Sequence, residues 1–232
     1  EKVSTATNYN IYRKENGASS WEPIGTVSKS KLYYIDKDVI NLEKYQYTVR
    51  AYDDNSVSEY NTVGVGTKYV KAPTVKTFKN VTSGVYLKWS KVSGASSYRI
   101  YRKTESGSWK LIKKLNNETF NYTDKDVKSG VKYSYAVKAV SSGTLSGYYT
   151  KTTEYLKKSV VTSAKSTKSG ITINYTKTAG ADKYYVYRRL SGEDDWTRIA
   201  TVKGASNVSY KDKTAKKGKT YYYSVRAYSG SY

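Results

Sequence analysis

The chain repeats one stretch of sequence three times, and this repetition constrains its fold more than any other feature. The stretch DKDVINLEKYQYTVRA at Asp36–Ala51 recurs as DKDVKSGVKYSYAVKA at Asp124–Ala139 and as DKTAKKGKTYYYSVRA at Asp212–Ala227. Every copy ends in a Tyr-x-Tyr-x-Val-x-Ala alternation, which places these four residues on one face of a β-strand. A 232-residue chain with this period is therefore a tandem array of one small β domain.

The middle copy predicts seven short strands separated by turn residues. Val85, Leu87 and Trp89 alternate with polar neighbours, and so do Tyr98 and Ile100, which places these five residues inward. No stretch has a sustained helical period of apolar residues. The fold class is therefore all-β, with tandem seven-stranded antiparallel β-sandwiches. The predicted strands lie near 74–80, 85–89, 98–103, 109–115, 119–123, 133–139 and 148–156.

The array divides into three repeats at 1–71, 72–156 and 157–232, and the first and last copies are incomplete. Lys2–Tyr9 aligns without a gap on Lys91–Tyr98, so the first copy lacks its first two strands. Tyr232 falls in the loop after the repeated strand of the third copy, which therefore lacks its last strand. Three explanations stand beside one another: a longer chain, a proteolytic product, or strands supplied by neighbouring chains.

The order of these motifs resembles fibronectin type III domains over the whole chain. The motifs are Trp89, the run Tyr98-Arg-Ile-Tyr, and the pattern Val127-x5-Tyr133-x-Tyr135-x-Val137-x-Ala139. The resemblance is strongest to the bacterial variety found in secreted and cell-wall proteins of Gram-positive species. It implies that Tyr133 is a tyrosine-corner residue whose hydroxyl bonds back to the preceding loop, with Val127 as an apolar plug. The corresponding pairs are Val39 with Tyr45 and Ala215 with Tyr221.

Two further positions distinguish these repeats from immunoglobulin domains and from one another. Immunoglobulin domains carry a Cys two residues after the corner, where this chain has Tyr47, Tyr135 and Tyr223. Aromatic packing is thus expected in place of a cross-link. In the third repeat Tyr175 stands where Trp89 does, and a buried hydroxyl there needs an acceptor, so we expect it to reach a domain end.

The composition argues against catalysis. The chain contains no Cys and no His, which excludes disulfides, thiol chemistry, Cys-ligated zinc and the usual general base near neutral pH. Phosphate-binding Gly loops and nucleophile elbows are absent from the sequence. We therefore predict no enzyme activity, no catalytic residue, no cofactor and no metal site. No apolar run approaches the ~18 residues of a membrane span, so a membrane is not an expected partner.

Two acidic clusters are the only candidates for such a site, and both have simpler interpretations. The Asp-Lys-Asp runs at 36–38 and 124–126 offer too few oxygen ligands for calcium, and they predict a polar turn in which Asp bonds to the backbone. The run at 193–195 lies at a predicted hairpin tip, which is convex and solvated rather than a cleft with opposed carboxylates.

The positive charge is large and unevenly distributed. The chain has 41 Lys and Arg against 19 Asp and Glu, a net charge of +22. Residues 1–71 hold 10 basic and 9 acidic side chains, whereas residues 72–156 hold 15 and 5 and residues 157–232 hold 16 and 5. Such a field favours anionic partners. The alternative is a Lys-rich solvated surface without a ligand.

One sheet face is the candidate binding surface. Tyr12, Tyr101 and Tyr187 point outward beside basic residues, and basic side chains also point outward from the neighbouring repeated strand. A tryptophan recurs at the start of the following strand, either as a stacking platform or as a packing element. The alternative for the whole face is cross-strand pairing of tyrosines with cations on a solvated sheet. The candidate ligand-binding residues are Tyr101, Arg102, Trp109, Lys138, Tyr187, Arg188, Trp196 and Arg226.

These features predict a non-catalytic extracellular or cell-surface segment that acts as a spacer and adhesion module of a large bacterial protein. Expected partners are an anionic cell-wall polymer or glycan, a host or partner protein, and neighbouring repeats of a longer chain; nucleic acid is not expected. The alternative is a carbohydrate-binding accessory region of a polysaccharide-degrading enzyme.

Overall fold

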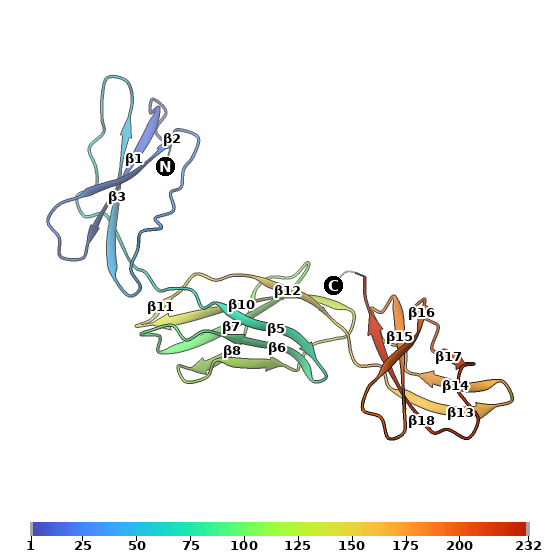
Figure 1. Cartoon of the computed structure of the whole chain (residues 1–232). Helices are drawn as coiled ribbons and strands as arrows, with labels where there is room; N and C mark the ends of the chain where they lie inside the picture. Colours follow the sequence, from blue (N-terminus) through green and yellow to red (C-terminus); the bar gives the residue numbers. More distant parts are fainter. Residues whose placement is uncertain (1, 231–232) are drawn as a thin grey trace.

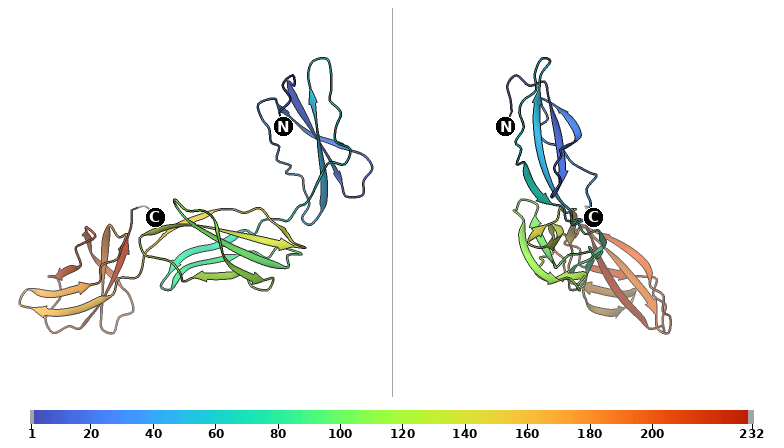
Figure 2. Two further views of the ribbon diagram at one scale, coloured as in Figure 1. Left: turned by 180° about the vertical axis from the view of Figure 1, so that it is seen from behind. Right: turned by 90° about the vertical axis from the view of Figure 1, so that its left-hand side faces the viewer.

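The computed structural model describes residues 2–230, which form eighteen β-strands and no helix. The strands gather into three units that follow one another end to end, with the middle unit between the other two (Figures 1 and 2). We call them repeat 1 (β1–β4), repeat 2 (β5–β12) and repeat 3 (β13–β18). Tyr232 lies outside the described residues.

Repeat 2 is an antiparallel sandwich of two sheets. One sheet has the order β5-β6-β9, and the other has the order β8-β7-β10-β12, with the short β11 paired to the far end of β10. This arrangement confirms the predicted all-β fold. The strands of repeat 2 are β5 (Val75–Val81), β6 (Gly84–Trp89), β7 (Ser97–Thr104), β8 (Lys110–Asn116), β9 (Asn121–Asp124), β10 (Val131–Ser141), β11 (Thr144–Leu145) and β12 (Lys151–Tyr155).

The flanking repeats use the same connectivity with fewer strands among the described residues. Repeat 3 pairs β13-β14-β17 in one sheet and β16-β15-β18 in the other, whereas repeat 1 is a single sheet of order β2-β1-β3-β4. Repeat 1 contains β1 (Asn8–Glu15), β2 (Glu22–Ser28), β3 (Lys44–Tyr52) and β4 (Val65–Lys68). Repeat 3 contains β13 (Val161–Thr167), β14 (Gly170–Tyr175), β15 (Lys183–Leu190), β16 (Thr197–Lys203), β17 (Ser209–Asp212) and β18 (Tyr221–Tyr228).

The core of repeat 2 consists of the inward residues that the alternation predicts. Leu87 and Trp89 of β6 lie opposite Tyr98 and Ile100 of β7, and all four side chains are buried. The Trp89 and Tyr98 rings pack with centroids 5.7 Å apart. Because apolar burial is the main favourable term in folding, this two-sheet contact is what makes repeat 2 a self-contained domain.

In repeat 3, Tyr175 occupies the position that Trp89 has in repeat 2. Its buried hydroxyl finds an acceptor at the end of the domain, as predicted. The Tyr175 hydroxyl donates to the Asn207 carbonyl at 2.9 Å, in the loop between β16 and β17. Burial, with the Tyr184 ring beside it, raises the pKa of Tyr175 to about 12. The Trp89 indole nitrogen is buried without a hydrogen-bond partner in the described part of the chain. Repeat 3 thus satisfies a polar group at the point where repeat 2 does not.

The three tyrosine corners are also present. The backbone nitrogen of Lys128 donates to the Tyr133 hydroxyl at 3.0 Å, and that of Ile40 donates to Tyr45 at 3.0 Å. The third corner, from Lys216 to Tyr221, measures 3.1 Å. Each bond joins the repeated strand to the loop five residues upstream, as the resemblance implied.

Candidate functional site

A carboxylate, buried in repeats 2 and 3 and partly buried in repeat 1, lies at one end of each repeat. In repeat 2, Oδ2 of Asp124 accepts hydrogen bonds from the Tyr135 hydroxyl at 2.8 Å and from Nη1 of Arg102 at 2.6 Å. Its other oxygen accepts from the backbone nitrogen of Asp126 at 3.1 Å. The Asp-Lys-Asp run therefore forms the predicted polar turn, with a second role in anchoring Arg102.

The same Asp–Tyr–Arg cluster recurs in the other two repeats. In repeat 1, Asp36 binds Tyr47 and Arg13, each at 2.9 Å. Although partial burial alone raises the pKa of the Asp36 carboxyl, the bonds from Tyr47, Arg13 and the Asp38 backbone bring it below its usual value. Burial first, and then the neighbouring carboxylate, raise the pKa of the Tyr47 hydroxyl. The cluster of repeat 3 is Asp212, Tyr223 and Arg188, with bonds of 2.9 and 2.8 Å.

This cluster gives Arg102 and Arg188 positions that differ from those of the other candidate ligand residues. Arg102 pairs with Tyr135 across β7 and β10, on the same face as Tyr98 and Ile100. Its guanidinium is committed to Asp124 and to the Asp126 carbonyl, the latter at 2.7 Å. Both arginines thus lie at the end of the inner face, and neither belongs to the outward surface.

The outward face of repeat 2 does bring aromatic rings and cations together. Lys138 lies over Tyr148 at 4.7 Å and over Tyr101 at 5.7 Å, and Lys103 lies over Trp109 at 5.4 Å. The Trp109 and Tyr148 rings meet edge to face with centroids 5.7 Å apart. We call Tyr101, Lys103, Trp109, Lys138 and Tyr148 the aromatic–cation ladder. It spans β7, β10 and the segments before β8 and β12.

The ladder recurs in repeat 1 at the corresponding positions. Lys14 lies 4.7 Å over Trp21, and Arg50 lies 5.2 Å over Tyr60. The Tyr60 ring stacks on Tyr12 with centroids 6.0 Å apart. Repetition across two copies indicates that the ladder packs together as a unit on a solvated sheet.

In repeat 3 the ladder is built with arginines. Arg226 lies 5.5 Å over Tyr187, and Arg189 lies 5.4 Å over Trp196, whose side chain is 43% exposed. Of the eight candidate ligand residues, six therefore gather on these outward faces. Sequence reasoning noted Lys103 beside Tyr101 without making it a candidate, and it missed Tyr148, whose signal was its position 88 residues after Tyr60.

The ladder is an open sheet face and not a cleft. It presents ammonium or guanidinium groups beside ring edges, whereas sites for small ligands are concave. Anionic groups can bind the cations, and the rings offer apolar contact for a sugar or another flat surface. Among residues 2–230 there is no group of three acidic side chains that could hold a metal ion, and no helix of a length and apolarity to cross a membrane.

The side chain of Asn41 bridges the junction between repeats 1 and 2, where Nζ of Lys68 also donates to the Ser141 hydroxyl at 3.2 Å. Nδ2 of Asn41 donates to the Ser93 carbonyl of repeat 2 at 3.0 Å, while Oδ1 of Asn41 accepts from the Lys71 nitrogen in the linker at 2.8 Å. The adjacent Leu42 has a left-handed backbone with φ of 77°, and its side chain occupies the space that a Cβ on Gly94 would need. One amide thus ties the linker and the next repeat to the loop of the first.

The junction between repeats 2 and 3 repeats this arrangement. Ser129, 88 residues after Asn41, donates to the Ala179 carbonyl at 2.8 Å and accepts from the Lys157 nitrogen at 2.9 Å. Gly130 and Gly180, with φ of 78° and 85°, meet backbone to backbone. Both junctions therefore use the same loops and the same bridging position.

The chain is similar in sequence or in structure to several known proteins. No protein-family model matches the chain. The chain is 47% identical over 60 residues to an amylopullulanase of Thermoanaerobacter thermohydrosulfuricus, a match that covers 25% of this chain and 4% of that protein. It is 33% identical to a solved Fn3-like protein from Clostridium thermocellum, over 37% of this chain and 95% of that one, with a TM-score of 0.31. The chicken CNTN1 FN1–FN3 domains give 15% identity over 97% of this chain and 85% of that one, with a TM-score of 0.35.

The strand order of repeat 2, with three strands facing four and a tyrosine corner on β10, defines an immunoglobulin-like β-sandwich. The chain is a tandem array of fibronectin type III-like β-sandwiches.

Proposed function

We propose that this chain is a non-catalytic spacer and adhesion segment of a secreted or cell-surface protein of a Gram-positive bacterium. The recurrent junction supports this proposal most strongly, because the side chains at one repeated position, Asn41 and Ser129, form hydrogen bonds between successive repeats. A linear array whose junctions have a defined geometry holds its two ends apart, which is the physical requirement for a spacer.

Small-angle X-ray scattering of the whole chain tests the spacer role. A compact globule of 232 residues has a radius of gyration of about 17 Å. We expect a distinctly larger value and an elongated distance distribution. A radius near that of the globule would contradict the spacer, irrespective of any ligand.

The adhesion part of the proposal rests on the aromatic–cation ladder. Repeats 2 and 3 together hold 31 basic side chains against 10 acidic ones, by the counts for residues 72–156 and 157–232 given above. Such a surface attracts anionic wall polymers, and the attraction weakens as salt increases. Titration with teichoic acid at several salt concentrations is the test: absence of binding at low salt would refute the adhesion part and leave the spacer.

A second candidate is a carbohydrate-binding accessory region of a polysaccharide-degrading enzyme. The specific observation in its favour is the 60-residue match to an amylopullulanase. In this case Trp109 of the ladder would stack on neutral sugar rings, so polysaccharide binding would persist at high salt. Loss of binding in Trp109→Ala, with the fold retained, would support this candidate over anionic attachment.

A further inference from the structure

The outward face of repeat 3 carries basic side chains at every level along its central strand. Successive outward residues of β15 are two positions apart, so the levels are spaced by about 6.6 Å along the strand. Strand register places at least one cation at each of four successive levels. We call these residues the cation row: Lys183, Arg226 opposite Tyr185, Arg198 opposite Tyr187, and Arg189.

Aromatic rings support the members of the cation row. Arg198 lies 4.8 Å over the Tyr185 ring, and Arg226 lies 5.5 Å over the Tyr187 ring. The other two members lie over rings of β18, at 4.2 and 4.9 Å. A ring beneath a guanidinium restricts its orientation and leaves its N–H groups available to an added ligand.

The two central arginines have no competing acceptor within the protein. Arg198 and Arg226 are exposed and form no hydrogen bond or ion pair among residues 2–230. Nη1 of Arg189 donates to the Glu193 carbonyl at 3.1 Å and lies 3.9 Å from the exposed carboxylate of Asp194. An exposed ion pair is weak, so an anion can also compete for this third arginine.

The other two repeats interrupt the row. In repeat 2 the level of Tyr101 pairs with Leu111 on one side and Ala136 on the other, and neither is basic. The corresponding level of repeat 1, at Tyr12, also pairs with no basic residue. The outward tyrosines are therefore common to the array, whereas the unbroken spacing of cations belongs to repeat 3.

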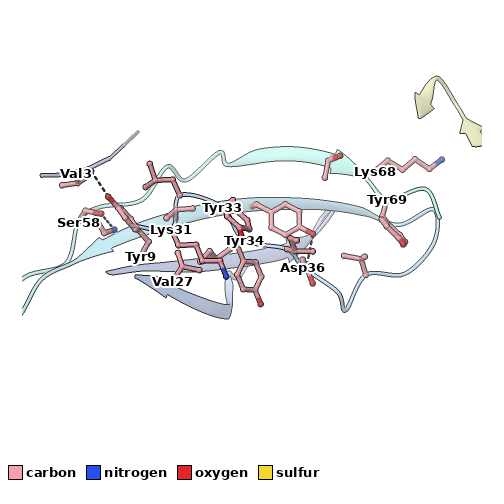
Figure 3. Close-up of a pocket in the computed structure, with 18 residues that line it drawn as sticks. Val3, Tyr9, Val27, Lys31, Tyr33, Tyr34, Asp36, Ser58, Lys68 and Tyr69 are labelled. Carbon is pink, nitrogen blue, oxygen red and sulfur yellow. Dashed lines mark hydrogen bonds between the residues drawn. The ribbon is translucent and has the colours of Figure 1, made fainter. Parts of the chain in front are cut away.

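The concave surface of repeat 1 offers no comparable set of cations. Among the described residues that line the groove on the inner face of its sheet, only Lys31 and Lys68 are basic (Figure 3). Nζ of Lys68 donates to the Ser141 hydroxyl, and Asp36 adds a carboxylate to the same lining. A polyanion thus meets a more favourable surface on repeat 3.

The spacing of the cation row matches one class of anionic polymer. One level corresponds to two extended residues, which contain six backbone bonds. Two phosphodiester groups joined through three carbon atoms are also six bonds apart, from one phosphorus to the next. A five-carbon link adds two bonds per repeat, so its phosphates fall out of step with the row. Guanidinium groups suit this ligand because their planar fork binds two phosphate oxygens at once.

We propose that the outward face of repeat 3 binds a linear phosphodiester polymer with three-carbon links, a chain of glycerol phosphate. The polymer runs along β15 with one phosphate at each level. Arg198 and Arg226 bind two successive phosphates, and the tyrosine rings contact the three-carbon links. This inference rests on the proposed adhesion to anionic wall polymers, and it assigns the repeat and the polymer that carry it.

The test compares two oligomers of equal charge by calorimetric titration of the whole 232-residue protein at low salt. Each oligomer carries four phosphates, linked through glycerol in one and through ribitol in the other. We expect the glycerol phosphate oligomer to bind at least fivefold more tightly. Its affinity should fall at least tenfold in Arg198→Gln/Arg226→Gln. It should fall at least threefold in Arg198→Lys/Arg226→Lys, which keeps both charges but loses the planar fork.

The matched control is Lys165→Gln/Lys211→Gln. These lysines are exposed on the β13-β14-β17 sheet, so the control removes two charges from the opposite side of the same repeat. We expect its affinity to change less than twofold. Near-ultraviolet circular dichroism should be unchanged in all three variants, because the altered side chains lie on solvated faces.

Several outcomes separate this inference from the adhesion proposal. Equal affinities for the two oligomers, equal losses in the row and control variants, or binding of teichoic acid but of neither oligomer would overturn the inference and leave adhesion standing. Single-stranded DNA of equal charge also has three-carbon links, and its bases stack on rings; tighter binding of this DNA would assign the face to nucleic acid instead. Absence of binding to teichoic acid and to both oligomers would refute adhesion, and this inference with it.

Discussion

The Tyr135 hydroxyl donates a 2.8 Å hydrogen bond to Oδ2 of Asp124, and both side chains are almost completely buried. Tyr135 occupies the position two residues after the tyrosine corner, where immunoglobulin domains carry a Cys. The bond joins β10 of one sheet to β9 of the other, so a hydrogen bond to a carboxylate connects the two sheets where a disulfide would. The recurrence of this pair in all three repeats makes it a defining feature of the array.

Removal of this carboxylate should destabilise repeat 2 substantially. In Asp124→Ala, Arg102 and Tyr135 lose a shared acceptor, and we expect the free energy of unfolding to fall by about 3 kcal/mol. Tyr135→Phe removes one bond to a charged group and should cost about 2 kcal/mol. Hydrogen exchange of the β10 amides measures both changes.

The matched control for this prediction is the exposed ion pair between Lys132 and Glu105, whose carboxylate side chain is 73% exposed. Glu105→Ala should change the free energy of unfolding, measured by hydrogen exchange, by less than about 0.5 kcal/mol. Equal effects of Asp124→Ala and Glu105→Ala would show that the buried cluster does not stabilise the repeat.

Acid should weaken the clusters of repeats 1 and 3. Burial opposes the effect, but hydrogen bonds hold the pKa of the Asp36 and Asp212 carboxyls below their ordinary value of 3.8. A carboxyl with a lowered folded-state pKa contributes stability above its unfolded-state value, and this contribution is lost as pH falls from about 4 through the folded-state value. We therefore expect the stability difference between wild type and Asp212→Asn to be large at pH 6 and to shrink towards pH 2.

Thermal unfolding followed by circular dichroism at several pH values measures this difference. Asp54→Asn, at an exposed position of repeat 1, is the control and should show no comparable trend. A difference for Asp212→Asn that stays constant from pH 6 to pH 2 would rule out the hydrogen-bonded carboxylate as its cause.

Lys138→Ala should weaken adhesion to an anionic polymer more than the loss of one charge elsewhere. Lys138 touches both Tyr101 and Tyr148, so its removal also disorders the ladder. Teichoic acid affinity at low salt should fall several-fold, and the salt dependence should become shallower. Lys79→Ala carries the same charge change on β5 of the opposite sheet, and equal losses in the two variants would indicate a diffuse field rather than a ladder site.

Gly180→Ala should loosen the junction between repeats 2 and 3. A Cβ at Gly180 would collide with the Gly130 backbone and with Oε1 of Glu154, and φ is 85°. Proteolysis in the linker at 156–159 should accelerate several-fold. Gly192→Ala has nearly the same backbone strain, with φ of 91°, but no atom within 4 Å of the added methyl. If both variants are cleaved alike, backbone strain rather than the junction contact is responsible.

The sandwich and its tyrosine corners could be predicted from the sequence, because they depend on local alternation and on a repeated motif. Leu87, Trp89 and Tyr133 lie where period-two patterning places them. The same alternation also places Arg102 on the inner face, but a charged residue is ordinarily assumed to face solvent. Only the position of Asp124 across the sandwich reveals why an arginine is stable there.

The junctions could not be predicted from the sequence in the same way. Asn41 bonds to Ser93, 52 residues later, and neither residue type is distinctive. The repeat even changes the chemistry of the bridge, from an amide at Asn41 to a hydroxyl at Ser129. Such contacts follow from how two folded domains meet, which no local pattern encodes.

The proposed fixed orientation of repeats 2 and 3 can be measured directly. Because the chain has no Cys, Lys114→Cys and Lys165→Cys carry spin labels only at these exposed strand positions. Double electron–electron resonance should give one narrow distance distribution, which Gly180→Ala broadens and Gly192→Ala leaves narrow. A broad distribution in the otherwise unaltered chain would contradict the spacer with defined junctions.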